Sequence, residues 1–306
     1  MASDAHAPKT WLRLRFVCSS ETAAALADHL SECGALAVSL DDAEDEPLYE
    51  PPSGTTPLWS NTRVSGLFRG DENPARLLGE LERRSAPGAL RAPQVERLED
   101  RDWLCVHREG FEPTRFGTRL WVVPSWSEPV ELTNDEVSIT LDPGIAFGTG
   151  HHPSTAMCLT WLAGQRLLER TLVDYGCGSG ILAVAAARLG ARRVWAVDCD
   201  EQALAATRRN AAANDVADRI RVVAPGDLPS LTAELLVSNI LANTLDGLAE
   251  TLCRLLRPGA RLALAGILCE QSPRLVARYA PWCALRVSAR DGDWVLLDGT
   301  RGDHGV

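Results

Sequence analysis

The segment TLVDYGCGSGILAVAAARLGARRVWAVD, residues 171–198, constrains the fold more strongly than any other part of the sequence. An apolar run ending at Asp174 leads into a glycine-rich turn, a run of small residues follows, and a second apolar run ends at Asp198. Alternating strands and helices of this kind form a parallel sheet covered by helices on both faces. Glycines in the turn let a ligand approach the backbone at the carboxyl edge of that sheet. The segment therefore predicts an α/β domain with a binding site at this edge.

Two cofactor classes compete for this turn. Gly178, Gly180 and Ala183 satisfy the dinucleotide pattern G-x-G-x-x-A, which fits a nicotinamide cofactor. The spacing Asp174-x-Gly176-x-Gly178-x-Gly180 is instead similar to the cofactor loop of class I methyltransferases, which use S-adenosylmethionine. Because the amino group and sulfonium of that cofactor are cationic, a carboxylate beside the loop attracts it, whereas the same carboxylate repels a pyrophosphate. We therefore favour S-adenosylmethionine, with capping of the turn by Asp174 as the structural alternative.

Polar residues follow the next three expected strands. Asp198 closes the strand RRVWAVD, where its two oxygens could accept hydrogen bonds from both ribose hydroxyls of either cofactor. Asp227 comes after the strand IRVVA and fits either an adenine contact or a simple turn. Asn239 ends the fourth run, at the edge that faces the transferred methyl group in methyltransferases. The remaining pattern predicts a Pro-Gly turn into a fifth strand (255–268) and a terminal hairpin (284–299), which is usual for methyltransferases and unusual for dehydrogenases.

The stretch LDPGIAFGTGHHPST, residues 141–155, gathers glycines and two histidines upstream of this domain. A phosphate loop is excluded, because His151 and His152 stand where Lys and a hydroxyl residue are required. A zinc site lacks a third ligand at a suitable spacing. Pro153 fits the first position of a helix, which places Thr155 in the first turn among unpaired backbone donors. Such a turn suits a carboxylate, and the methionine part of S-adenosylmethionine has one.

The first hundred residues show a different pattern. Strands are expected at 11–19, 35–42, 62–70 and 93–100, and helices at 21–34 and 73–85, which gives the ferredoxin-like order βαββαβ. The acidic, Pro-rich stretch 41–57 is a loop that either recognises a Lys-rich partner or is a solvated connection. An aromatic-rich connecting segment with short strands follows, and we assign it no chemistry.

Composition narrows the function classes. The net charge of −10 over 306 residues disfavours a general nucleic-acid binder. Nine cysteines occur without a C-x-x-C pair, so neither a disulfide framework nor a structural metal is indicated, and a reducing cytoplasm is the simplest setting. We expect no export signal, no membrane span and no metal cofactor.

The motifs GIAFGTGHHPST, VDYGCGSGILAVAA, AVDCD and SNILAN together closely resemble the ribosomal protein L11 methyltransferases, the PrmA family. The resemblance covers nearly the whole chain and implies a ferredoxin-like recognition domain (1–100), an interdomain linker (101–133) and a Rossmann-like methyltransferase domain (134–306). It implies cofactor contacts at the following positions: Thr155, Gly176, Gly178, Asp198 and Asn239. Tyr175, His151 and His107 depart from the residues frequent in the family.

The resemblance also implies an activity. Methyl groups would pass from S-adenosylmethionine to lysine side chains and the N-terminal α-amine of L11, with S-adenosylhomocysteine released, in a cytoplasmic monomer. The alternative is lysine methylation of another protein, such as an electron-transfer flavoprotein subunit. We hypothesise that Asn239 orients the amine and that Phe147 lines the target channel. His151 or His152 is either a proton acceptor or, as we favour, a packing or capping residue.

Overall fold

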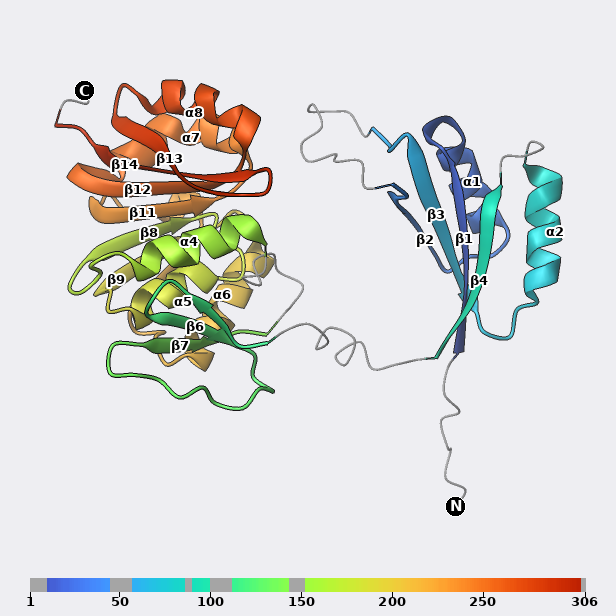
Figure 1. Cartoon of the computed structure of the whole chain (residues 1–306), viewed down its shortest axis with the longest axis horizontal. Helices are drawn as coiled ribbons and strands as arrows, with labels where there is room; N and C mark the ends of the chain where they lie inside the picture. The colour runs from blue at the N-terminus through green and yellow to red at the C-terminus, as the bar shows by residue number, and fades with distance from the viewer. Residues whose placement is uncertain (1–9, 45–56, 86–89, 100–111, 143–151, 304–306) are drawn as a thin grey trace, which may run out of the picture. The chain divides into compact units, whose positions relative to one another are not determined.

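The computed structural model describes residues 10–44, 57–85, 90–99, 112–142 and 152–303 (Figure 1). These residues belong to two compact units, 1–109 and 110–306. In the described parts of the chain, no helix has the length and apolar character that crossing a bilayer requires.

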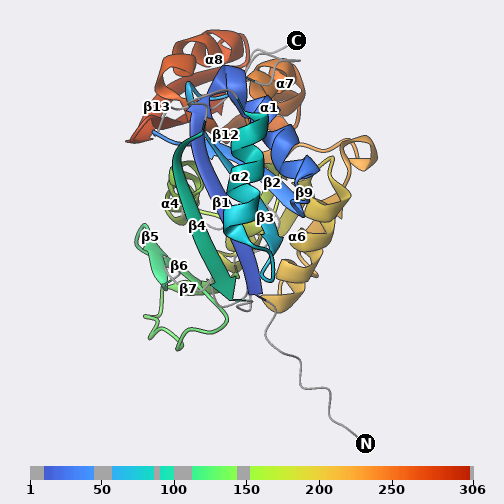
Figure 2. The ribbon, with the colours of Figure 1, turned by 90° about the vertical axis from the view of Figure 1, so that its right-hand side faces the viewer.

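The N-terminal unit is an antiparallel sheet with two helices on one face (Figures 1 and 2). Its strands lie in the order β2-β3-β1-β4, which confirms the predicted ferredoxin-like topology. A core of leucine and phenylalanine side chains, including Phe16 and Leu81, joins the helices to the sheet. In chain order the elements are β1 (Thr10–Ser19), α1 (Ser20–Glu32), β2 (Ala37–Asp42), β3 (Asn61–Arg69), α2 (Pro74–Arg84) and β4 (Arg91–Glu99).

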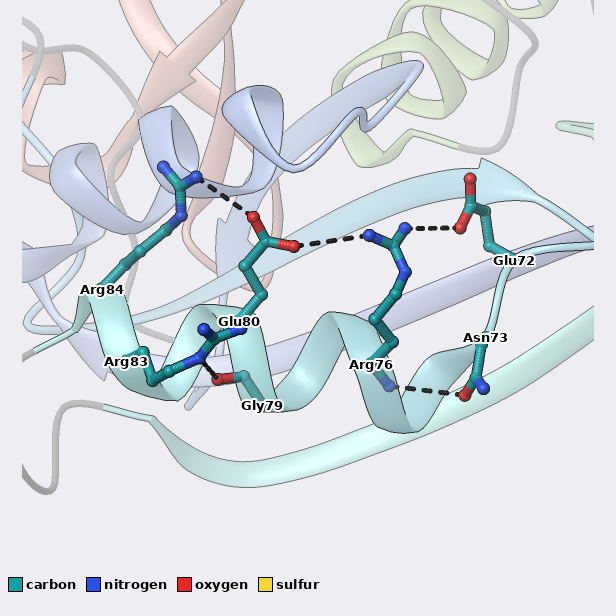
Figure 3. Close-up of polar contacts among 7 residues, drawn as sticks. All are labelled: Glu72, Asn73, Arg76, Gly79, Glu80, Arg83 and Arg84. Carbon is teal, nitrogen blue, oxygen red and sulfur yellow. Dashed lines mark hydrogen bonds and ion pairs between the residues drawn. The ribbon is translucent and has the colours of Figure 1, made fainter.

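Helix α2 shows how this unit distributes its side chains. Leu77 and Leu81 are fully buried against the sheet. The Asn73 side chain accepts hydrogen bonds from Ala75 N and Arg76 N, so it caps the helix. Along the outer face, ion pairs run from Glu72 through Arg76 and Glu80 to Arg84 (Figure 3). Exposed ion pairs of this kind contribute little, so apolar burial determines where the helix packs.

The C-terminal unit contains a seven-stranded sheet in the order β10-β9-β8-β11-β12-β14-β13. The first five strands in this order, β10, β9, β8, β11 and β12, are parallel to one another, which confirms the predicted α/β Rossmann-like fold. Strand β14 is antiparallel to both of its neighbours, which confirms the terminal hairpin. Its strands are β8 (Thr171–Tyr175), β9 (Arg193–Val197), β10 (Ile220–Val223), β11 (Ala233–Asn239), β12 (Leu256–Leu268), β13 (Cys283–Asp291) and β14 (Trp294–Arg301).

Helices pack on both faces of this sheet. One apolar core contains side chains of α4, α5 and α6, and a second core on the other face contains side chains of α7 and α8. Every residue of α5 from Ile181 to Ala187 is buried, because this helix of small residues lies closely against the sheet. The helices are α4 (Pro153–Ala163), α5 (Ile181–Arg188), α6 (Glu201–Ala213), α7 (Ala242–Arg254) and α8 (Ser272–Tyr279).

A small three-stranded sheet precedes α4 in the same unit. It comprises β5 (Thr114–Phe116), β6 (Leu120–Val123) and β7 (Val137–Thr140). Phe116 and Ile139 join the core with α4 and α5, and the Arg119 guanidinium donates to the carbonyls of Ala163 and Gln165 at 3.0 Å each. The described part of the predicted linker, residues 112–133, therefore lies in the C-terminal unit. The division into segments 1–100, 101–133 and 134–306 that was inferred from the sequence stays a prediction.

Strand β12 differs from its expected form. The sequence indicates a Pro-Gly turn leading into the strand, but the strand already begins at Leu256 and pairs there with Ala233. The next pair is Leu235 with Arg261, so the intervening residues of β12, including Gly259 with a φ of +74°, bulge out of the ladder. The Pro-Gly pair thus makes an irregularity within a strand, because pairing on both sides of it holds the backbone in the sheet.

Candidate active site

A pocket of about 500 Å³ lies at the carboxyl edge of β8, β9 and β11. This is the edge at which open α/β sheets bind ligands. Four of the residues predicted to bind the cofactor line it: Gly176, Gly178, Asp198 and Asn239. The other lining residues are Tyr175, Cys199, Asp200, Gln202, Ala203, Pro225, Ile240, Thr244 and Leu248.

The glycine turn needs its glycines for two separate reasons. Gly176, Gly178 and Gly180 have φ values of +80°, +54° and +79°, a region that other residues rarely adopt. A Cβ atom on Gly176 would also lie 2.2 Å from Ile240 Cγ2, and one on Gly180 would lie 2.7 Å from the Thr207 side chain. The turn therefore packs directly against the segment after β11 and against α6, with its backbone exposed toward the pocket.

Asp198 follows the last residue of β9 and is half-buried. One carboxylate oxygen accepts a hydrogen bond from Gly178 N at 2.9 Å, and the other accepts one from Asp200 N at 3.0 Å. These bonds fix the orientation of the carboxylate at the pocket wall. Each oxygen can accept a second hydrogen bond, so two donors on a ligand can still be bound.

Asn239 and Thr155 are 84 residues apart in sequence but meet at the site. The Asn239 side-chain amide donates to Thr155 Oγ1 at 3.0 Å. Thr155 lies in the first turn of α4 and is 2% exposed. Because the NH₂ group of Asn239 is used in this contact, the side-chain oxygen is the acceptor available to an amine. Of the five predicted contacts, Thr155 does not line the pocket itself but touches a residue that does.

Asp174 lies in β8, immediately before the glycine turn, and is fully buried. Among the described residues, neither of its oxygens meets the geometric criterion for a hydrogen bond, although the Ala183 N–H in the first turn of α5 is directed at it, so capping of the turn stays an open alternative. Burial raises the pKa of Asp174 to about 7; the Ala183 backbone N–H opposes this shift, and the charge of Asp198 adds to it. A buried carboxylate without a partner is costly unless a positive charge compensates it. Asp174 does not line the pocket itself, but it lies immediately before the glycine turn, where its negative charge favours a cationic ligand over an anionic one.

His152 serves as the N-cap of α4. Its Nδ1 accepts a hydrogen bond from Ser154 N at 3.3 Å, and its ring packs edge-on against Trp294 with centroids 4.7 Å apart. Burial lowers the pKa of His152, which keeps the ring neutral and able to accept. These contacts agree with the capping and packing role favoured from the sequence. His151, Phe147 and His107 lie outside the described residues.

Some pocket residues were not found from the sequence. Asp227 is exposed in a 3₁₀ turn (Pro225–Asp227) and does not line the pocket, whereas Pro225 at the start of that turn does. Thr244 and Leu248 come from α7, and Ile240 lies two residues before this helix begins. The four-residue spacing of Thr244 and Leu248 places both on one face of α7, and this spacing shortly after Asn239 was the available signal.

These features fit S-adenosylmethionine better than a pyrophosphate cofactor. Asp198 offers paired acceptors for two hydroxyls, and Asp174 favours a cation. The unpaired backbone donors expected in the first turn of α4 are not found, because Ser154 N donates to His152 Nδ1 and the N–H groups of Thr155 and Ala156 donate to the His152 carbonyl. A dinucleotide would place its phosphates beside Asp174 and Asp198, two carboxylates that repel them.

Comparisons with known proteins agree on one family. The chain matches the family described as Ribosomal protein L11 methyltransferase (PrmA) over residues 10–302. It is 48% identical over 292 residues to the ribosomal protein L11 methyltransferase of Azotobacter vinelandii, covering 95% of this chain and 99% of the relative. The corresponding protein of Marinobacter nauticus is 46% identical over 297 residues, covering 96% and 99%.

A solved structure gives the same result. The crystal structure of a ribosomal protein L11 methylase from Lactobacillus delbrueckii subsp. bulgaricus has a TM-score of 0.56 and 29% sequence identity. The alignment covers 63% of this chain and 98% of that chain.

Proposed function

The chain belongs to the ribosomal protein L11 methyltransferase (PrmA) family, and from this membership we propose that it methylates amino groups of ribosomal protein L11. It is an enzyme that depends on S-adenosylmethionine. One observation carries the proposal furthest: Gly176, Gly178, Asp198 and Asn239 converge on one pocket at the carboxyl edge of the sheet. The target amines that we propose are lysine side chains and the N-terminal α-amine.

The residues around the pocket divide the binding task. Asp198 would accept hydrogen bonds from the ribose hydroxyls, since its oxygens are held by Gly178 N and Asp200 N. The positive end of the α4 dipole and the Thr155 hydroxyl would favour the methionine carboxylate, since the backbone N–H groups of the first turn are already bonded to His152. Asp174, behind the glycine turn, would compensate the cationic part of the ligand. No metal takes part in this proposal.

The reaction requires a neutral amine close to an electrophilic carbon. S-adenosylmethionine supplies that carbon as a methyl group on a sulfonium, and S-adenosylhomocysteine is the product. Asn239 would orient the amine through its side-chain oxygen, because Thr155 holds the other end of the amide. A lysine amine has an ordinary pKa near 10.4, and desolvation at the pocket lowers that pKa and favours the neutral form. Positioning accounts for most of the rate enhancement.

The N-terminal unit has a separate task in this proposal. It would recognise L11 as the substrate, with the predicted boundaries 1–100, 101–133 and 134–306 separating recognition, linker and catalysis. We propose that the enzyme works as a cytoplasmic monomer and makes no direct contact with nucleic acid. The net charge of −10 supports the last point, because a polyanion is repelled by such a surface.

The deciding experiment is the intact mass of purified L11 after incubation with the enzyme and S-adenosylmethionine. A ladder of added methyl masses supports the proposal. Asp198→Ala is the matched control, since it removes both ribose acceptors; we expect its cofactor affinity to fall about 100-fold, by two charge-assisted hydrogen bonds. Unchanged L11 mass with normal cofactor binding would refute the substrate and leave another lysine-bearing protein as the target.

A further inference from the structure

Leu241 is an exposed apolar residue beside the pocket. Its side chain is 51% exposed, and it follows Ile240, which lines the pocket. Five other large hydrophobic residues are exposed in the described parts of the chain, and none of them adjoins a pocket-lining residue in sequence: Leu36, Val95, Leu132, Leu168 and Val287. Single exposed leucines are common, so its location at the site is what calls for an explanation.

The conformation of Leu241 makes its identity unusual. It occupies the N-cap of α7, with φ −57° and ψ 143°, and it makes no side-chain capping bond. Ser, Thr, Asp and Asn are preferred at this position because their oxygens accept from the first turn. Helices α4 and α6 begin at the same edge of the sheet with side-chain caps, His152 and Asp200, while α5 begins there with Gly180, which has no side chain to cap it. At the start of α7, a leucine makes no capping bond and exposes an apolar side chain to solvent.

We propose that Leu241 packs against the methylene stem of the target lysine while Asn239 orients the amine. This inference rests on the proposed function. Two residues of extended chain span at most about 7 Å, which is comparable with the length of a lysine side chain. Lysine stems bury readily along apolar surfaces while the nitrogen reaches a polar partner. Leu241 is therefore a specificity residue for amines on an alkyl stem.

The absence of a carboxylate at the N-cap of α7 also favours methyl transfer, which needs the neutral amine. An Asp cap would stabilise the protonated ammonium, which is not nucleophilic. The uncapped N-terminus of α7 carries partial positive charge instead, which disfavours the ammonium form. Leu241 thus contributes apolar contact without supplying a negative charge to the amine.

The proposal predicts a difference between two kinds of target amine. The N-terminal α-amine of L11 has no alkyl stem between the nitrogen and the backbone, so it gains nothing from Leu241. Loss of the leucine should lower methylation of lysines roughly tenfold, the effect expected for lost apolar contact in a specificity pocket, and lower α-amine methylation much less.

The test compares Leu241→Ser with wild type on L11, with peptide mass spectrometry resolving each amine. Serine is a good N-cap, so a purely structural role predicts a higher Tm and unchanged methylation. We expect a Tm at least equal to wild type, unchanged cofactor affinity by calorimetry, and the selective loss of lysine methylation. Leu241→Met should recover most of the lost rate, and Leu168→Ser, an exposed leucine away from the pocket, should leave all rates unchanged.

Two failures of this test are distinguishable. Full lysine methylation by Leu241→Ser overturns the role of Leu241 and leaves the proposed function standing. An equal loss at lysines and at the α-amine also overturns it, because the contact would not depend on the stem. Absence of L11 methylation by the wild-type enzyme refutes the proposed function, and this inference with it.

Discussion

In the described parts of the chain, the N-terminal unit keeps its charged side chains at the surface, whereas the C-terminal unit buries carboxylates, including those of Asp174 and Asp298. Among the described residues of the first unit, the buried polar side chains are the hydroxyls of Thr62 and Ser65. In the second unit Asp298 is buried but paired with Arg261 at 2.7 Å, while Asp174 is buried with no cationic partner among the described residues. The charged side chains of the first unit are therefore solvated and do not lower its stability. The unpaired charge in the second lowers stability, which marks the place where a ligand is expected.

The strongest test of this contrast is Asp174→Asn. The pKa of Asp174 is raised in the folded chain, so its contribution to stability is present below its ordinary pKa and is lost as pH rises through about 7. The wild type should lose about 4 kcal/mol of unfolding free energy between pH 4 and pH 8 from this group, and the variant should not. Urea unfolding across this pH range measures the difference.

Cofactor titration completes that test. If Asp174 compensates a cationic ligand, Asp174→Asn binds S-adenosylmethionine more weakly at pH 8 while its pH-dependent loss of stability disappears. An identical pH dependence of stability in both proteins would show that Asp174 does not titrate in this range.

In the N-terminal unit the largest effect should come from the apolar core. Leu77 is fully buried in α2, and Leu77→Ala should lower stability by about 3 kcal/mol through lost burial and a cavity. Hydrogen exchange localises the loss to this unit. The neighbouring half-buried Leu78 provides a matched control with a smaller effect. The variant should bind S-adenosylmethionine normally, and a weakened affinity would contradict the division of tasks between the units.

Asn239→Ala tests the catalytic side of the contrast. We expect turnover to fall roughly 10- to 100-fold, since the amine loses its orienting oxygen. Cofactor affinity should fall much less. Steady-state kinetics and calorimetry together separate the two effects, and equal losses in both would reject the orienting role.

The smallest effect should come from the ion pairs of α2. Glu80 pairs with Arg76 at 3.5 Å and with Arg84 at 3.1 Å on the outer face of the helix (Figure 3). Glu80→Ala should change stability by less than about 1 kcal/mol, and added salt should reduce the difference. Thermal unfolding at low and high salt measures both. A loss as large as that from Leu77→Ala would mean that surface charge, and not the core, holds this helix in place.

Local patterns predicted the elements of the fold well. Apolar periodicity placed the strands of both units, and Pro153 marked the observed start of α4. Strand ends also brought Asp198 and Asn239 to one edge, because parallel strands place their carboxyl ends together. The binding roles assigned to these residues stay predictions.

Features that depend on contacts between residues far apart in sequence could not be predicted from local sequence patterns. The bond between Asn239 and Thr155 joins residues 84 positions apart, and the burial of Asp174 without a cationic partner among the described residues follows from packing on every side. The bulge around Gly259 depends on pairing with β11. The direction of a short 3₁₀ turn decides that Pro225, and not Asp227, lines the pocket. Each is decided by tertiary geometry, which periodicity does not encode.

The position of β14 between β12 and β13 affects how the protein is made. During synthesis β13 leaves the ribosome before β14. In the folded sheet, however, β13 is the outer strand and forms its hydrogen bonds with β14. Until residues 294–301 emerge, β12 presents an open edge and β13 has no strand to join. Open edges invite pairing with other chains. The nascent enzyme is therefore most prone to aggregate just before its last strand inserts.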